Sequence, residues 1–259
     1  MGKGKGGAGC TVGVLELAYA ATQRRRGRRR RRVAVIDLDP QGDATAVLEP
    51  ASRRRGIKDA LTPHQPLPLS EVLVPTAWEG VLVAPADRYL ANRESDLTVH
   101  AMATLLRARK SGELDELVDD VVIDLPRNIG KLATAGLLGI EHLFITSRAT
   151  VWAAQGAEEM RYTAERIREK RNPDLKIPGI IVAEYDESRD SRRVLESMQS
   201  NFSKFGIPVF DPVPRRVRVR EAIESYHTPC RDFGAPELEE VADMYQSFYD
   251  HVLTQEGAR

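Results

Sequence analysis

The chain has 259 residues, and its 38 Lys and Arg side chains balance 38 Asp and Glu, so its overall charge indicates no class of partner. Only two cysteines are present, Cys10 and Cys230, which excludes a disulfide-stabilised scaffold, and no apolar run reaches the roughly 18–20 residues of a membrane-spanning helix. These properties predict a cytoplasmic protein, and the length fits one large α/β domain as well as two small ones; the pattern of elements described below predicts a single domain over residues 1–259.

A glycine-rich segment opens the chain, with the sequence Lys5-Gly6-Gly7-Ala8-Gly9-Cys10-Thr11. Such a loop at the start of a helix binds phosphate through backbone N–H groups, and a hydroxyl at Thr11 is placed for a phosphate-bound Mg²⁺. The usual pattern has a lysine directly before that hydroxyl residue, where this chain has the mostly neutral thiol of Cys10. Taken alone, the segment is either a degraded nucleotide site or a flexible terminus.

The strand that normally leads into such a loop is not evident. Only four residues, Met1 to Gly4, precede the loop, and they are too few and too rich in glycine for a buried strand. Either the fold lacks its first strand, or the recorded start lies downstream of the natural one. We favour the second explanation, because a gap in the sheet would leave backbone polar groups unpaired.

Short apolar runs alternate with longer helical patterns along the rest of the chain. Strands are predicted at 33–37, 80–84, 120–124, 142–146, 179–183 and 208–210. Helices are predicted at 12–24, 87–109, 113–118, 131–138, 153–170, 189–204 and 236–254, and the Pro-rich segment 62–70 is expected to be a surface loop. This alternation predicts an α/β fold of three layers, in which helices cover both faces of a parallel sheet.

Arginine is concentrated between the first predicted helix and the strand at 33–37. Residues 1–56 contain 13 Lys and Arg against 5 Asp and Glu, and Arg24–Arg26 and Arg28–Arg32 supply eight of them. Gly27 is predicted to end the helix. The run either contacts DNA or forms a solvated turn, and the sequence alone favours the solvated turn.

Carboxylates follow two of the predicted strands. Asp37 and Asp39 stand at the end of the strand at 33–37, and Asp124 ends the strand at 120–124. Ligands of open α/β sheets bind at this edge, so a shared site is predicted there. The alternatives are a turn at Asp37 and Asp39 and a helix cap at Asp124.

Four segments, in order, resemble the signatures of the ParA/MinD-type deviant Walker ATPases. Lys5–Thr11 resembles their phosphate loop, and residues 36–45 resemble their second signature. Residues 120–126 are similar to the strand motif on the magnesium side, and residues 213–222 are similar to the segment after the last core strand of ParA proteins. The resemblance extends from Lys5 to about Leu253 and is closest to the Soj-like ParA partition proteins.

The resemblance implies a P-loop NTPase fold that binds ATP and Mg²⁺. Its catalytic residues would be Asp39, which positions the attacking water, Asp37 beside it, and Lys5, which reaches the partner subunit's phosphates. The metal would be held by Thr11, Asp37 and Asp124. The nucleotide would be bound by Gly6, Gly7, Ala8, Gly9, Cys10, Thr11, Pro214 and Arg215.

The resemblance also implies an ATP-dependent homodimer that binds DNA without sequence preference, on the nucleoid, and responds to a centromere-binding, ParB-like partner. Its DNA-binding arginines would be Arg189, Arg216, Arg218 and Arg220. In a strand-like stretch the last three would share one face; the alternative is a solvated charged edge. The acidic C-terminus is unlike the basic membrane helix of MinD-type proteins, so no membrane contact is expected.

Two hypotheses therefore remain. The chain is either an ATPase that drives plasmid or chromosome partition, or a non-hydrolysing ParA-like DNA-binding scaffold. Cys10 and the absent strand favour the scaffold. The ATPase is favoured by four residues that are all present, namely Thr11, Asp37, Asp39 and Asp124. A site that no longer hydrolyses ATP has no physical need of this set.

Overall fold

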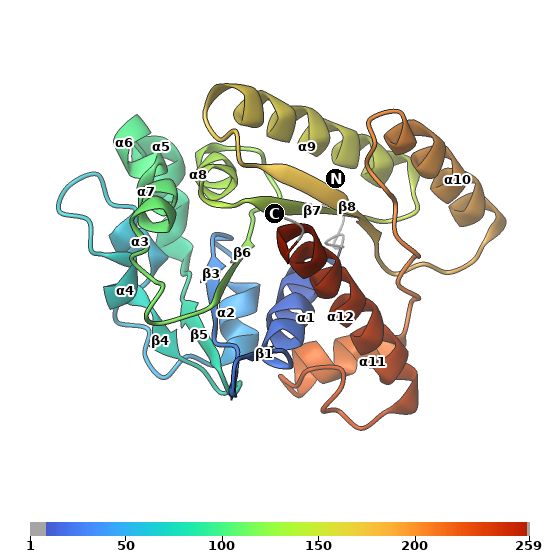
Figure 1. Cartoon of the computed structure of the whole chain (residues 1–259), viewed down its shortest axis with the longest axis horizontal. Coiled ribbons are helices and arrows are strands. Elements are labelled where there is room, and N and C mark those ends of the chain that lie inside the picture. The colour runs from blue at the N-terminus through green and yellow to red at the C-terminus, as the bar shows by residue number, and fades with distance from the viewer. Residues whose placement is uncertain (1–8, 258–259) are drawn as a thin grey trace.

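The structure, a computed structural model, describes residues 9–257 (Figure 1). Its strands are β1 (Arg25–Arg26), β2 (Arg29–Arg30), β3 (Val33–Asp37), β4 (Val74–Pro75), β5 (Val81–Ala84), β6 (Asp120–Asp124), β7 (His142–Ser147) and β8 (Lys176–Val182). Its longer helices are α1 (Cys10–Thr22), α2 (Asp43–Leu48), α7 (Thr104–Ser111), α8 (Lys131–Gly139), α9 (Val151–Lys170), α10 (Arg189–Ser203) and α12 (Pro236–Gly257). Shorter turns are α3 (Ile57–Ala60), α4 (Leu69–Val72), η1 (Arg88–Asn92), α5 (Arg93–Asp96), α6 (Val99–Met102), α11 (Val217–Arg220) and η2 (Glu221–Ser225).

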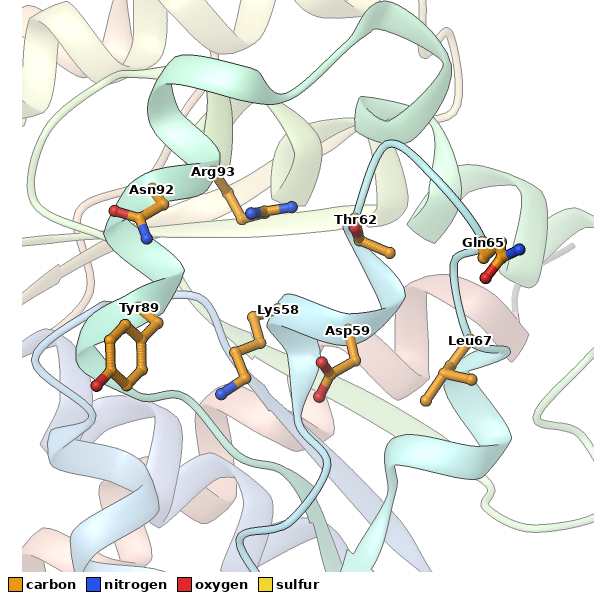
Figure 2. Close-up of a pocket in the computed structure, with 8 residues that line it drawn as sticks. All are labelled: Lys58, Asp59, Thr62, Gln65, Leu67, Tyr89, Asn92 and Arg93. Carbon is orange, nitrogen blue, oxygen red and sulfur yellow. The ribbon is translucent and has the colours of Figure 1, made fainter.

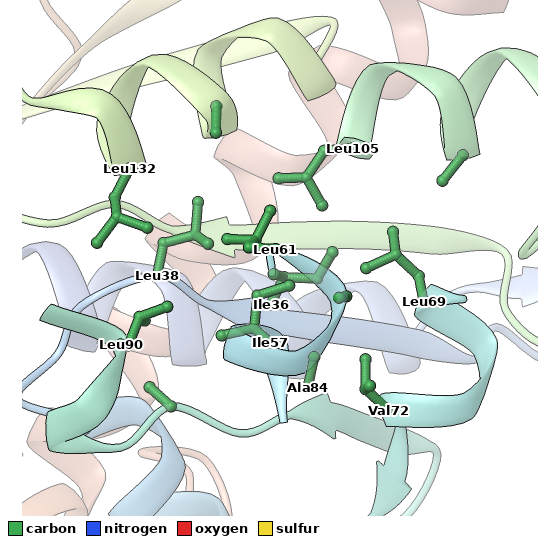
Figure 3. Close-up of a cluster of buried hydrophobic side chains, with 14 of the residues drawn as sticks. Ile36, Leu38, Ile57, Leu61, Leu69, Val72, Ala84, Leu90, Leu105 and Leu132 are labelled. Carbon is green, nitrogen blue, oxygen red and sulfur yellow. The ribbon is translucent and has the colours of Figure 1, made fainter. Parts of the chain in front are cut away.

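The predicted three-layer α/β architecture is confirmed. Strand β3 pairs in parallel with β5 and with β6, β4 adds an antiparallel edge to β5, and β7 pairs in parallel with β8. Because side chains alternate along a strand, Ala34 and Ile36 pack into the core beneath α3, α4 and α7, whereas Val33 and Val35 pack against α1 and α2. Figure 3 shows the first of these clusters, with Ile36 and Leu38 among leucines from the surrounding helices.

The sheet is interrupted between β6 and β7. Within residues 9–257 no strand lies between them, and the parallel strands form a four-stranded and a two-stranded sheet. A cavity of about 400 Å³ fills the interval, lined by Val121 and Val122 of β6, Leu143 and Phe144 of β7, and Gly13 of α1. The predicted lack of a first strand therefore corresponds to a gap in the described sheet, next to the helix that follows the glycine loop.

Helix α1 is tied to the C-terminal part of the chain. The buried carboxyl group of Glu16 accepts a hydrogen bond from the backbone N–H of Cys230 at 2.9 Å. A Cβ added to Gly13 would lie in ordinary van der Waals contact with the ring of Tyr245 in α12, at 3.6 Å, so the two helices are neighbours at this point. The first and last long helices thus form one packed pair.

Several predicted elements are wrong in detail. The predicted helix at 87–109 consists of four short helical pieces. Two side chains cap new turns within it: Asp87 accepts a hydrogen bond from Tyr89 N, and Thr98 accepts one from Ala101 N. The helix at 113–118 is a series of turns. The strand at 208–210 is reduced to an isolated bridge between Val209 and Ile180. The Pro-rich loop ends early, since α4 starts at the buried Leu69.

Two predictions about arginine segments are also wrong. Helix α1 ends at Thr22, and Gly27 has a φ of 66° in the turn between β1 and β2, where a primed hairpin turn requires that conformation. The stretch after Arg216 is helical in α11, so residues two positions apart, such as Arg218 and Arg220, do not share a face as they would in a strand. Among residues 9–257, none of the helices has both the length and the apolar content to cross a membrane.

Candidate functional site

At the start of α1 the backbone of Gly9 lies very close to the segment that follows β8. Gly9 precedes the helix with a φ of 71°, and a Cβ there would lie only 2.9 Å from the Cβ of Ala183 after β8. No acidic side chain lies in the first turn of the helix. The first backbone N–H groups and the positive end of the helix dipole therefore favour an anion at this position.

Helix α1 and strand β6 meet through two adjacent side chains. The Thr11 hydroxyl donates a hydrogen bond to Asp124 Oδ2 at 2.9 Å, and the Cys10 thiol donates to Asp124 Oδ1 at 3.6 Å. Asp124 is buried at the end of β6. The predicted metal residues Thr11 and Asp124 are thus in direct contact.

Asp37 lies beside Asp124 on the neighbouring strand and has the same register position. Its carboxylate accepts hydrogen bonds from Asp39 N at 3.1 Å, Thr45 N at 2.9 Å and Thr45 Oγ1 at 2.6 Å. The Thr45 hydroxyl in turn accepts one from Ala86 N at 2.9 Å. Asp37 therefore orients the loop and the start of α2, and Thr45 is a site residue that the sequence reasoning missed.

Asp39 is less enclosed than the other two carboxylates. It is partly exposed in the turn after β3, where its Oδ1 accepts a hydrogen bond from Gln41 N at 2.9 Å. Asp39 therefore shapes the turn, as the alternative considered from the sequence has it, and its carboxylate also remains accessible. An accessible carboxylate at this edge can accept a hydrogen bond from water.

The two buried carboxyl groups disfavour their charged forms. Burial raises the pKa of Asp124 to about 7, and the nearby charge of Asp37 adds to the effect. Burial likewise raises the pKa of Asp37 to about 6, although hydrogen bonds from Thr45 oppose the shift. A cation bound near these two buried carboxyl groups would lower the pKa of both and so favour their ionised forms.

The donor set fits magnesium bound to a nucleotide better than an independent metal. Carboxylate and hydroxyl oxygens are the hard ligands that Mg²⁺ takes, together with waters and phosphate oxygens. No group of three or more His, Cys, Asp and Glu side chains in the described part of the chain is arranged to hold a metal. Thr11 and Asp124 could therefore hold Mg²⁺ with phosphate oxygens completing its coordination.

Cys10 does not fit the pattern of a phosphate loop. Burial raises the pKa of its thiol to about 12, and the charge of Asp124 contributes to the increase. The thiol is therefore neutral at physiological pH and supplies no positive charge to a phosphate. Lys5, Gly6, Gly7 and Ala8, the other predicted loop residues, lie outside the described residues.

The segment predicted to lie near the nucleotide base runs beside the chain after β8. Pro214 forms a parallel bridge with Tyr185, and Arg215 N donates a hydrogen bond to the carbonyl oxygen of Tyr185 at 2.8 Å. Ala183, two residues before Tyr185, faces Gly9. Pro214 and Arg215 are thus linked to the loop through one short extended segment.

The predicted DNA-binding arginines differ in their partners. Arg216 pairs with Glu240 at 3.0 Å, Arg218 with Glu237 at 3.4 Å, and Arg220 with Glu224 at 3.3 Å. Arg189, the first residue of α10, is exposed. The C-terminal arginine cluster is therefore compensated by glutamates of the same chain.

A separate surface pocket of about 240 Å³ lies away from these residues. Figure 2 shows its mostly polar lining, with Lys58 of α3 pointing toward the ring of Tyr89. Lys58 is also ion-paired with Asp87. None of the predicted site residues lines this pocket, so we place the candidate site at the glycine loop and the strand ends.

Comparison with known proteins finds relatives that match most of this chain. The family model described as an AAA domain matches residues 1–177. The chromosome partitioning protein ParA of Caulobacter vibrioides is 30% identical over 224 residues, which cover 84% of this chain and 80% of the relative. The chromosome-partitioning ATPase Soj of Thermus thermophilus is 32% identical over 219 residues, which cover 84% of this chain and 81% of the relative.

A solved structure extends the likeness to the fold. Cobyrinic acid a,c-diamide synthase from Mycobacterium smegmatis, with bound ATP analog and magnesium, matches with a TM-score of 0.69 and 29% identity. The match covers 87% of this chain and 91% of that chain. From its sequence, its fold and these relatives, the chain belongs to the ParA/MinD-type superfamily of P-loop ATPases, among the relatives of the ParA and Soj partition proteins.

Proposed function

We propose that this chain is a ParA-like partition protein that binds ATP with Mg²⁺, dimerises, and binds DNA without sequence preference. It would act on the nucleoid in the cytoplasm, with a ParB-like partner, to segregate plasmid or chromosome DNA. The observation that carries the proposal is the contact between Thr11 and Asp124 at 2.9 Å, at the edge where α1 begins. An intact hydroxyl–carboxylate pair at the start of this helix supports a site for a metal bound to phosphate.

In this proposal each site residue has one task. Thr11 and Asp124 hold Mg²⁺, and Asp37 supports the site through its bonds to Thr45 and Asp39. Asp39 positions the attacking water, and Lys5 contributes charge to the partner subunit's phosphates. The phosphates lie on Gly6, Gly7, Ala8, Gly9 and Cys10, the base lies near Pro214 and Arg215, and DNA contacts Arg189, Arg216, Arg218 and Arg220.

A specific observation also supports a second candidate, a non-hydrolysing ParA-like scaffold. The neutral thiol of Cys10 contacts Asp124 at 3.6 Å, at the position where the family has a lysine. Without that ammonium group, less positive charge is available to stabilise the phosphoryl group during transfer. Nucleotide binding would then persist while turnover is lost.

Measurement of ATP turnover in the presence of DNA distinguishes the two candidates. The parent chain is compared with Cys10→Lys, and Cys10→Ala is the matched control that removes the thiol without adding charge. Turnover by the parent supports the partition ATPase, whereas turnover by Cys10→Lys alone supports the scaffold. Failure of all three proteins to bind ATP would contradict the proposed nucleotide site.

A further inference from the structure

The arginine run forms a two-stranded hairpin rather than a disordered turn. Strands β1 and β2 are antiparallel, with Arg25 opposite Arg30 and Arg26 opposite Arg29. Successive side chains of a strand point to opposite sides, so each face of the hairpin carries one pair of arginines. The two faces can therefore be compared directly.

One face is neutralised within the protein. Asp119, just before β6, accepts hydrogen bonds from Arg26 Nη1 at 2.9 Å and from Arg29 Nη2 at 2.7 Å. It also accepts one from Arg32 N at 2.8 Å, and its side chain has no exposed surface. Asp119 thus holds the hairpin against the sheet and compensates the Arg26–Arg29 face.

The other face has no such carboxylate. Arg25 Nη1 donates to the carbonyl oxygen of Arg28 at 3.1 Å, and Arg30 Nη1 donates to Gln23 Oε1 at 3.5 Å. Across residues 9–257, none of the ion pairs includes either residue or Arg28, and all three are exposed. Like charges directly opposite on a hairpin destabilise it, so this face favours an anion from outside the chain.

We propose that the Arg25–Arg30 face of the hairpin, extended by Arg28 in the turn, binds the phosphate backbone of double-stranded DNA. This inference rests on the proposed DNA-binding function and assigns that function a surface distinct from the C-terminal arginine cluster. Guanidinium groups present planar pairs of N–H donors that match phosphate oxygens. Residues 24–32 contain only arginine and one glycine, so the hairpin lacks the apolar side chains that anchor a protein in a lipid surface.

The hairpin follows the C-terminal end of α1, whereas Gly9 precedes the N-terminal end of the same helix (Figure 1). A helix of this length spans about 20 Å at 1.5 Å per residue. The hairpin face therefore stays accessible whether or not a nucleotide is bound at the loop. Its contribution to DNA binding is expected to be the same with ATP, with ADP and without nucleotide.

Two double variants with the same change in net charge test the proposal. Arg25→Gln/Arg30→Gln alters the uncompensated face, and Arg26→Gln/Arg29→Gln alters the face bound to Asp119. Binding of short DNA duplexes of unrelated sequence is measured by fluorescence anisotropy over a range of KCl concentrations. The plot of log affinity against log salt should become shallower by about 2 in the first variant, and clearly less so in the second.

The charge-retaining variant Arg25→Lys/Arg30→Lys should keep the parent slope, and it guards against loss through misfolding. Equal slopes for the two Gln variants would overturn the inference, as would a loss of binding to phosphatidylserine vesicles with DNA binding unchanged. Displacement of DNA by inorganic phosphate at matched ionic strength would also overturn it, because it would indicate a single-anion site. If neither the parent nor any variant binds DNA under any nucleotide condition, the proposed function itself fails.

Discussion

Asp37 and Asp124 occupy the same register position on adjacent parallel strands, so two buried carboxyl groups lie side by side at the end of the sheet. Burial raises the pKa of both groups, to about 6 and about 7. A carboxyl group with a raised pKa binds its proton more tightly in the folded chain than in the unfolded one. Its contribution therefore favours folding at acidic pH and declines as the pH rises from about 4 to about 7.

The variant Asp124→Asn tests the predicted direction of this pH dependence, because it removes the buried charge while its side-chain oxygen can still accept the hydrogen bond from Thr11. Without divalent cations, the melting temperature of the parent should fall between pH 5 and pH 8 more steeply than that of the variant. At pH 8 the variant should be more stable by about 2 kcal/mol. Thermal melts across this pH range check the result, and parallel profiles for the two proteins would contradict it.

The hydroxyl of Thr45 should contribute more to the free energy of unfolding than the hydroxyl of an ordinary buried threonine. Replacement by Val would remove one of the three hydrogen bonds that Asp37 accepts, while the two from backbone N–H groups remain, and it would leave Ala86 N without an acceptor. This should cost about 2 kcal/mol of unfolding free energy. Thr22→Val is the matched control, since that buried hydroxyl donates to the carbonyl oxygen of Tyr19 in its own helix and accepts a bond from the adjacent Gln23 side chain, and neither of these bonds involves a buried carboxylate. Urea unfolding of both variants measures the difference in free energy of unfolding. Similar losses of stability in the two variants would contradict a larger contribution from the hydrogen bonds around Asp37.

The gap between β6 and β7 should be visible in hydrogen exchange. Strand β3 is paired on both sides, whereas β6 is paired with β3 alone among the described strands. Amides of β6 that point away from β3 should exchange at least about tenfold faster than those of β3. Site-resolved exchange by NMR checks this, and uniform protection of β6 would mean that its free edge is covered.

Asp119 should stabilise the sheet as well as the hairpin. Asp119→Ala would leave Arg26, Arg29 and the N–H of Arg32 without their acceptor, at a cost of about 1–2 kcal/mol. The arginine partners hold the pKa of Asp119 well below its usual range, so the parent keeps this contribution above pH 4 and loses it only in stronger acid. Melts of the parent and variant at pH 7 test the loss, and equal stability would contradict it.

Much of the sheet could be predicted because its signals are local. Strands 33–37 and 120–124 have the predicted bounds, since each is a β-branched run that ends at a carboxylate. The meeting of Asp37 with Asp124 was also predictable, because the carboxyl ends of parallel strands share one edge. Both inferences depend on short local patterns and on general sheet geometry, whereas the contact of Thr11 with Asp124 was expected only from the family resemblance.

The rest depends on contacts between distant segments. Nothing near the arginine run indicates that Asp119, about 90 residues later, would order it into a hairpin. The breaks in the helix at 87–109 come from the caps at Asp87 and Thr98, which compete with a pattern that otherwise reads as one helix. The role of Thr45 had a weak signal, since it follows the turn at Gly42, but only the folded chain brings it back to Asp37.

The hydrogen bond from the Cys230 amide to Glu16 couples the position of the first long helix to that of the C-terminal part of the chain. A shift of α1 would strain this bond and the contact with Tyr245, so the segment that carries Cys230 and the last long helix are expected to move with it. Occupancy at one extremity of the molecule can in this way be communicated to a surface formed by residues more than 200 positions later.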